Sequence, residues 1–250
     1  MQKKKRIYAG IIMLICFLFL AGCVPGGAKK EKETQADYYL GVVSDNAPYY
    51  YEEDGTPKGY YVDFIAGLAK QASFTYEFVA VDNASYSENL SKKVIDGFIG
   101  EAEISSEDNI GASEPFYISD ICVLVPEGSV ISNLKGIKDN GIASVANTQE
   151  EVFAKYLANH YKGQSVAFTS IREALSDIEA GNAQVLVVDE PYYKQHTAEF
   201  KNWKVLKTSS RFQNKHRFFM QKDGKLQKVY SKGIKVLEAD DGLKKIFTEF

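Results

Sequence analysis

The chain has 250 residues, with 30 Lys and Arg against 33 Asp and Glu, for a net charge of −3 at pH 7. Without the four cations at positions 3–6 the balance becomes 26 to 33, or −7. A negative surface disfavours nucleic acid and anionic lipid headgroups as partners. The length suits one large domain or two small ones.

The N-terminus has the layout of a secretory signal, with basic residues at 3–6 and an apolar stretch at 7–20. That stretch is shorter than the ~20 residues that cross a bilayer, which disfavours a spanning helix. It ends in Leu-Ala-Gly-Cys, a tetrad that resembles the bacterial lipoprotein signal. The resemblance implies that Cys23 is diacylated, becomes the mature N-terminus and anchors the chain outside the cytoplasmic membrane. We expect residues 1–22 to be the signal and 23–36 a flexible, polar tether.

Cysteine usage excludes a disulfide in the mature body. Cys16 leaves with the signal, Cys23 is the expected anchor, and Cys122 lies in an apolar run at 121–125. A lone cysteine in such a run is typical of a small core residue rather than a nucleophile.

Strands and helices are predicted to alternate from residue 37 onward, which favours an α/β sheet with crossover helices. The helix beginning near Asp63, a plausible N-cap, shows apolar residues at helical spacing. Strands are predicted at 39–43, 49–51, 74–81, 97–100, 121–125, 141–145, 165–168, 183–188, 204–206 and 217–220. The other helices are predicted at 86–94, 149–159, 171–180, 226–237 and 242–250.

Three predicted strands end in polar loops. The strand at 97–100 leads into an acidic loop with Glu101, Glu103, Glu107 and Asp108, and the strand at 183–188 ends at Asp189. The strand at 141–145 leads to a third loop, which contains Thr148. Open α/β sheets bind ligands at the carboxyl ends of their strands, so these loops are candidate binding elements.

The order of these pieces resembles the extracellular solute-binding proteins of amino-acid ABC importers, family 3, over about residues 38–250. The resemblance rests on Pro48-Tyr49, on Gly59-Tyr60-Tyr61-Val62-Asp63, on Ser113-Glu114-Pro115-Phe116, on Asn147-Thr148, and on the segment from Gly181 to Asp189. It implies a two-lobed, periplasmic-binding-protein-like (type II) fold with two hinge strands and a ligand cleft between the lobes. Lobe one would be 37–120 plus 216–250, and lobe two 121–215.

The same resemblance implies the function and the partners. The chain would be a monomeric binding protein rather than an enzyme, need no metal or cofactor, and deliver a small solute to ABC permease subunits. Asp189 stands where the family binds the ammonium of an amino acid, and Thr148 can offer its hydroxyl and backbone N–H.

The carboxylate-binding half of the family's site is replaced by other residues. Asp108 stands at the position of the family's Arg, which would bind the α-carboxylate bidentately. Glu103 replaces a Thr or Ser contact, Glu101 a small residue, and Asn46 a stacking aromatic residue. Acids near a ligand carboxylate would repel it, so we expect a polar or amine-bearing solute, an amino acid or a derivative, that lacks a free α-carboxylate.

Aromatic and cationic residues elsewhere leave two points open. Tyr86, with Tyr49, could supply the missing aromatic wall, or could belong to the core. Near the second hinge, three cations could replace the missing partner of a carboxylate: Arg211, Lys215 and Arg217.

Four other interpretations remain open. Glu101 and Glu107 could be solvated loop charges, and the protein could be a solute sensor or a degenerate accessory lipoprotein of the same fold. Paired carboxylates could act as general acid and base in an enzyme. Glu101, Glu103 and Asp108 could bind a hard cation, although their spacing is irregular. The histidines have no metal-ligand spacing, and we expect His196 and His216 on the surface.

Overall fold

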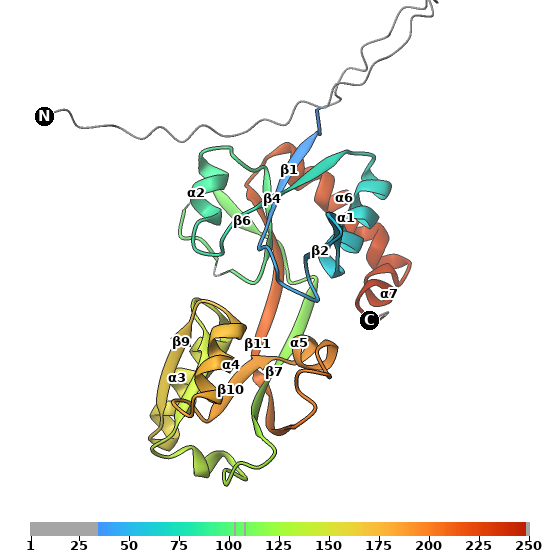
Figure 1. Ribbon diagram of the computed structural model, residues 1–250. Coiled ribbons are helices and arrows are strands. Elements are labelled where there is room, and N and C mark those ends of the chain that lie inside the picture. The colour runs from blue at the N-terminus through green and yellow to red at the C-terminus, as the bar shows by residue number, and fades with distance from the viewer. Residues whose placement is uncertain (1–34, 103, 108, 249–250) are drawn as a thin grey trace, which may run out of the picture. The chain divides into compact units, whose positions relative to one another are not determined.

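A computed structural model describes residues 35–248 except 103 and 108. These residues form a mixed α/β fold (Figure 1). The strands are β1 (Tyr38–Val42), β2 (Tyr51–Glu53), β3 (Thr56–Lys58), β4 (Tyr76–Ala80), β5 (Gly97–Gly100), β6 (Ile110–Ala112), β7 (Tyr117–Pro126), β8 (Gly141–Val145), β9 (Gln164–Phe168), β10 (Val185–Asp189) and β11 (Trp203–Gln221). The helices are α1 (Tyr60–Ala72), α2 (Tyr86–Ser91), the short 3₁₀ helix η1 (Leu134–Ile137), α3 (Gln149–Tyr161), α4 (Ile171–Glu179), α5 (Glu190–Gln195), α6 (Lys225–Ala239) and α7 (Gly242–Thr248).

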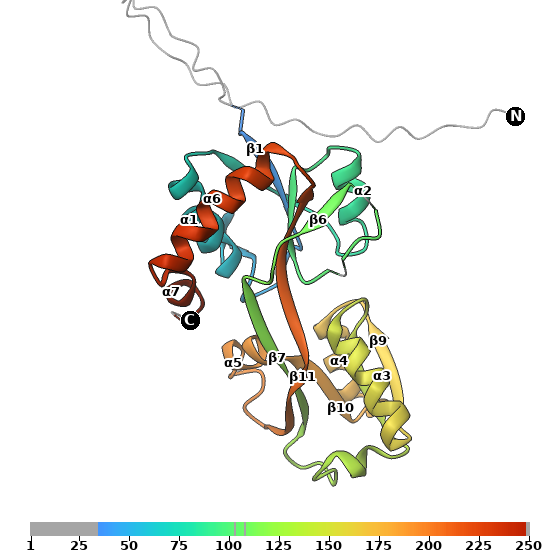
Figure 2. The same cartoon turned by 180° about the vertical axis from the view of Figure 1, so that it is seen from behind.

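The strands form two α/β halves that share two long strands. They hydrogen-bond in the order β4-β1-β5-β11-β7-β10-β8-β9, with β6 also on β11, while β2 and β3 form a separate hairpin. In the first half, β1 to β6 are covered by α1, α2, α6 and α7; in the second, β8 to β10 are covered by α3, α4 and α5 (Figures 1 and 2). We call β7 and β11 the crossing strands because they run through both halves.

The crossing strand β11 differs from the sequence prediction. The two short strands expected at 204–206 and 217–220 are parts of one strand of 19 residues. No strand was predicted for its polar middle, but its backbone pairs with β7 from Trp203 to His216, apart from two register shifts. Pairing with β7 therefore sustains the strand where side-chain patterning does not.

Helix α1 begins three residues before Asp63, the predicted N-cap. Gly59 occupies the cap position and makes no side-chain cap bond. Backbone carbonyls take over that role, because the N–H groups of Tyr60 and Tyr61 donate to Pro48 O at 3.0 Å and Tyr49 O at 2.9 Å. The start of α1 thus fixes the loop that carries Tyr49.

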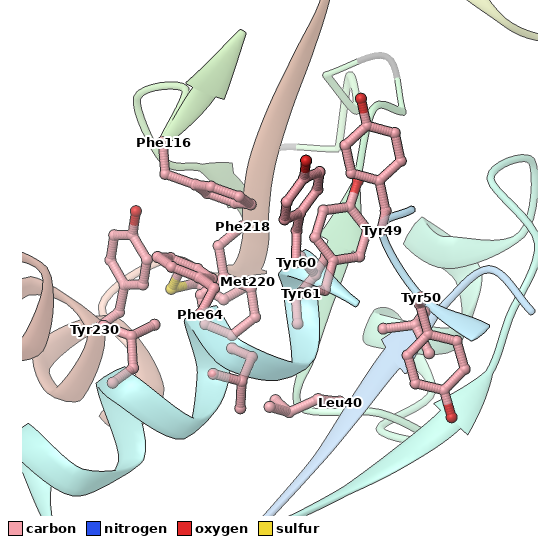
Figure 3. Packing of buried hydrophobic residues seen from close by; sticks show 14 of the residues in the cluster. Leu40, Tyr49, Tyr50, Tyr60, Tyr61, Phe64, Phe116, Phe218, Met220 and Tyr230 are labelled. Carbon is pink, nitrogen blue, oxygen red and sulfur yellow. The ribbon is translucent and has the colours of Figure 1, made fainter. Parts of the chain in front are cut away.

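Each half has its own hydrophobic core. The first half packs aromatic side chains around α1, where Phe64 stacks on Phe116 with ring centroids 4.1 Å apart (Figure 3). Figure 3 also shows the hydroxyl groups of Tyr49 and Tyr60 pointing the same way, away from Leu40 at the base of the cluster. The second half packs apolar residues of β7, β8 and β10 against α3 and α4. Cys122 lies in this second core with 1% of its surface exposed, as its apolar context predicted.

Several sequence predictions lie outside the described residues: the signal at 1–22, the lipid anchor Cys23, most of the tether, and the site candidates Glu103 and Asp108. Within the described part of the chain, no helix is long and apolar enough to span a membrane.

Replacing Gly59 by Ala should destabilise the fold by roughly 2 kcal/mol or more. Its φ of +111° disfavours any side chain, and a Cβ there would lie 2.5 Å from Tyr49 O and 2.6 Å from Pro48 O. Gly55→Ala is the matched control, because φ is also positive but the space is open, so strain of about 1 kcal/mol is expected. Urea unfolding of both variants measures the difference, and equal losses would contradict this account.

Candidate functional site

Asp189 ends strand β10 and lies between the two halves with 7% of its surface exposed. Its Oδ1 accepts hydrogen bonds from Ser119 Oγ at 2.6 Å and from Asn214 Nδ2 at 3.0 Å. Its Oδ2 accepts one from the Tyr49 hydroxyl at 2.5 Å. Ser119 and Asn214 come from the crossing strands and Tyr49 from the first half, so side chains of the first half and of the shared strands solvate this carboxylate.

A buried histidine stands behind these donors. His216 on β11 is fully buried, which corrects its predicted surface position, and burial lowers its pKa to about 3, so that the ring is neutral. Its Nε2 lies 3.1 Å from Ser119 Oγ and its Nδ1 lies 2.8 Å from the Tyr61 hydroxyl. Because Ser119 gives its proton to Asp189, we assign the Nε2–H tautomer, with Tyr61 donating to Nδ1. The chain of donors therefore points toward Asp189.

A second carboxylate, Glu150, lies in the first turn of α3 and is 7% exposed. Its Oε1 accepts from Asn214 Nδ2 at 2.8 Å, so one amide nitrogen serves both Glu150 and Asp189. This fixes the Asn214 amide with Nδ2 toward the acids. Glu150 Oε2 and Asn214 Oδ1 are buried and have no hydrogen-bond partner among the described residues.

Asp189, Glu150 and Tyr49 border a cavity of about 100 Å³ that we call the acidic cavity. Four of the predicted site residues meet there: Asn46, Glu101, Thr148 and Asp189. Glu150 and Tyr192 also line the cavity and were not predicted as site residues. Tyr49 was predicted only as an aromatic wall, and its hydroxyl group bonds to Asp189 as well.

Burial and repulsion between carboxylates raise the pKa values of two acids in the acidic cavity. The pKa of Asp189 is raised to about 7, first by burial and then by the charge of Glu150, although three hydrogen bonds oppose the rise. The pKa of Glu101 is raised well above its usual range by burial and by the charges of Glu150 and Asp189, against a hydrogen bond from Asn46. The lining includes no Lys, Arg or His among the described residues. A cation placed there would relieve this repulsion.

Two larger cavities adjoin the acidic cavity through shared residues. One of about 500 Å³ shares Glu101 and Thr148 with it and is also lined by Tyr86. Another of about 330 Å³ shares Glu101 with it and is lined by three cations: Arg211, Lys215 and Arg217. Glu101 thus lies where the three spaces meet.

Two predicted site residues have structural roles as well. Tyr86 is 4% exposed and its ring lies 5.0 Å from Phe98 and 4.7 Å from Phe219, so most of it belongs to the core of the first half. Thr148 is the N-cap of α3: its hydroxyl accepts from the Glu151 N–H at 3.3 Å and donates to Val145 O at 2.7 Å. The Thr148 side chain thereby orients the helix turn that carries Glu150.

Comparison with known proteins identifies relatives across the whole described body. The family described as bacterial extracellular solute-binding proteins, family 3, matches residues 38–250. The chain is 19% identical over 242 residues to the arginine-binding extracellular protein ArtP of Bacillus subtilis (strain 168), covering 94% of each.

Solved structures agree on the fold. An ancestral arginine-binding protein bound to arginine has a TM-score of 0.71 at 18% identity, covering 84% of this chain and 96% of the other. The ancestral amino acid-binding protein AncCDT-1, a precursor of cyclohexadienyl dehydratase, has a TM-score of 0.69 at 20% identity, with 84% and 92% covered. The predicted two-lobed, periplasmic-binding-protein-like α/β fold is confirmed.

Asp189 predicts how stability depends on pH. Its pKa is about 7 in the folded protein against an ordinary 3.8, so between about pH 4 and 7 the folded state binds more protons than the unfolded state. Stability of the ligand-free protein should therefore fall as pH rises through this window, by on the order of 2 to 4 kcal/mol. Melting temperatures from pH 5 to pH 8 measure this.

The Asp189→Asn variant should show a shallower pH dependence, and not a flat one, because the raised pKa of Glu101 has the same sign. Asp177→Asn, on α4 and outside the acidic cavity, is the matched control and should keep the original slope. A wild-type slope in Asp189→Asn would show that Asp189 does not titrate in this range.

Proposed function

The chain belongs to the bacterial extracellular solute-binding proteins, family 3, and from that premise we propose that it captures a small amine-bearing solute and delivers it to an ABC importer. The observation that carries this proposal is the buried Asp189 carboxylate, which borders a cavity with two further acids and no lining cation among the described residues. The solute is a derivative of an amino acid that keeps the amine and lacks a free α-carboxylate.

Charge supports an amine as the group bound in the acidic cavity. A buried carboxylate costs free energy unless it meets donors or positive charge, and the raised pKa of Asp189 reflects that cost. An ammonium group supplies both. Asp189 keeps acceptor capacity for it, because Oδ2 receives a single hydrogen bond, from Tyr49.

The same charges disfavour an α-carboxylate in the acidic cavity. In an α-amino acid the carboxylate lies two bonds from the ammonium nitrogen, so it would meet Glu101 and Glu150 rather than a cation. Cations line the two neighbouring cavities instead: one cavity has Arg211, Lys215 and Arg217, and the other has Lys155. The arginine-binding relatives bind a solute with a cationic side chain, and we propose that this chain retains selection for the positive charge.

The membrane role follows from the family and from the N-terminal sequence. We propose that Cys23 is lipidated, that residues 24–36 tether the body, and that the monomeric body presents its ligand to permease subunits. The predicted lobes, 37–120 plus 216–250 and 121–215, would close on a solute that contacts both. If the protein is a solute sensor, it would bind the solute in the same way and present it to a signalling receptor instead of a permease.

A catalytic role is the second candidate, favoured by the raised pKa of Asp189, which suits a general acid near neutral pH. AncCDT-1, with the same fold, is described as the precursor of a dehydratase. We propose binding, and incubation of bound ligand with the protein distinguishes the two. A ligand recovered unchanged after many equivalents of exposure supports binding, whereas a dehydrated or hydrolysed product supports catalysis.

The binding proposal predicts that amines shift the melting temperature of the mature chain. A ligand at 100 times its dissociation constant adds about 2.7 kcal/mol of stability. We expect a shift with propylamine, putrescine or agmatine, a smaller one with glycine or glutamate, and none with any amine in Asp189→Asn. Asp177→Asn should respond as the wild type does. Equal shifts with glutamate and with amines would contradict the proposal.

A further inference from the structure

Glu150 Oε2 is the feature of the acidic cavity that a single ammonium on Asp189 does not explain. The Glu150 side chain lines the cavity, is 7% exposed, and Oε2 has no hydrogen-bond partner among the described residues. Its other oxygen and Asp189 Oδ1 both accept from Asn214 Nδ2. These two oxygens therefore lie no more than about 6 Å apart. A buried acceptor left open beside a second carboxylate calls for a donor with positive charge.

The number of acids exceeds what one positive charge can offset. Asp189, Glu150 and Glu101 line a space of about 100 Å³, and the described lining residues contribute no cation. The mutual repulsion of these acids is visible in the raised pKa values of Asp189 and Glu101, each of which has Glu150 as a cause. His216 behind the site is neutral and Tyr49 keeps its proton, because burial raises its pKa well above the usual range. One monovalent cation would serve one of these acids and leave the others either protonated or charged without a cation beside them.

Glu101 is placed to receive a second positive group. It follows β5 in the first half, whereas Asp189 and Glu150 belong to the second half, and it also lines the cavity of about 500 Å³. A solute lodged at Asp189 and Glu150 can therefore extend past Glu101 into the larger space. That space adds Glu107 and Glu151 to its lining, and its only cation among the described residues, Lys155, is ion-paired with Glu151.

We infer that the cleft selects an organic dication, with one positive group bound between Asp189 and Glu150 and the second bound by Glu101. This inference rests on the proposed binding of an amine and specifies its class: an aliphatic diamine or a guanidino-amine without a carboxylate. Glu150 is then a ligand-contacting residue, and Glu101 determines specificity for the second charge.

A divalent metal ion is the alternative dication. Among the residues that the structure describes, no group of three or more His, Cys, Asp or Glu is arranged to hold a metal ion. Calcium chloride is therefore a control in the test, and it should leave the melting temperature unchanged.

The test compares 1,3-diaminopropane, putrescine, cadaverine and agmatine with propylamine, butylamine and pentylamine by calorimetric titration of the mature chain at about pH 8. We expect at least one dication to bind roughly tenfold or more tightly than the monoamine of equal length. Glu101→Gln should remove this preference, because it should weaken dications roughly tenfold more than monoamines. Glu150→Gln should weaken both kinds of ligand.

Glu107→Gln is the matched control, because Glu107 lines the larger cavity and not the acidic cavity. It should keep the preference for dications. A preference that survives Glu101→Gln, or that Glu107→Gln removes equally, would overturn the inference, as would calcium binding in place of diamines. If monoamines bind and diamines bind no tighter, the inference fails and the proposed function stands. If no amine binds, both fail.

Discussion

The cleft is organised around the cost of burying Asp189. Three donors offset that cost: Tyr49 comes from the first half, and Ser119 and Asn214 come from the crossing strands that the two halves share. A carboxylate whose hydrogen bonds come from both halves constrains how the halves meet. If Tyr49 moved away, Asp189 Oδ2 would lose its hydrogen bond and would be either exposed to water or buried without a donor. The loop that carries Tyr49 is in turn fixed by the start of α1 at Gly59.

The pattern of apolar and polar residues was sufficient to predict the α/β class and part of the site, while the two-lobed arrangement came from the resemblance to family 3. The apolar run that ends at Asp189, the loop before Thr148 and the acidic stretch after β5 were recognisable because strand exits place polar groups at the sheet edge. The lining of the acidic cavity by Asp189, Thr148, Glu101 and Asn46 agrees with those positions. Their contact with a ligand stays a prediction.

The remaining parts depend on contacts between distant segments, which local patterns do not encode. His216 and Asn214 lie in a polar run for which no strand was predicted, and they are buried because β11 pairs with β7 through that region. Glu150 resembles any acid in the first turn of a helix, and only the approach of Asn214 distinguishes it. Asp63 was a plausible cap, but the helix begins at Tyr60, because the carbonyls of Pro48 and Tyr49 accept hydrogen bonds from the N–H groups of Tyr60 and Tyr61.

The hydrogen bond from Tyr49 to Asp189 Oδ2 limits the directions from which a cation can reach that oxygen. The phenol occupies one lone pair of Oδ2 and leaves the other open. An ammonium that binds there adds a bond without breaking one, so the Tyr49 hydroxyl can stay in place during capture. The bound cation is then oriented by a donor that belongs to the opposite half.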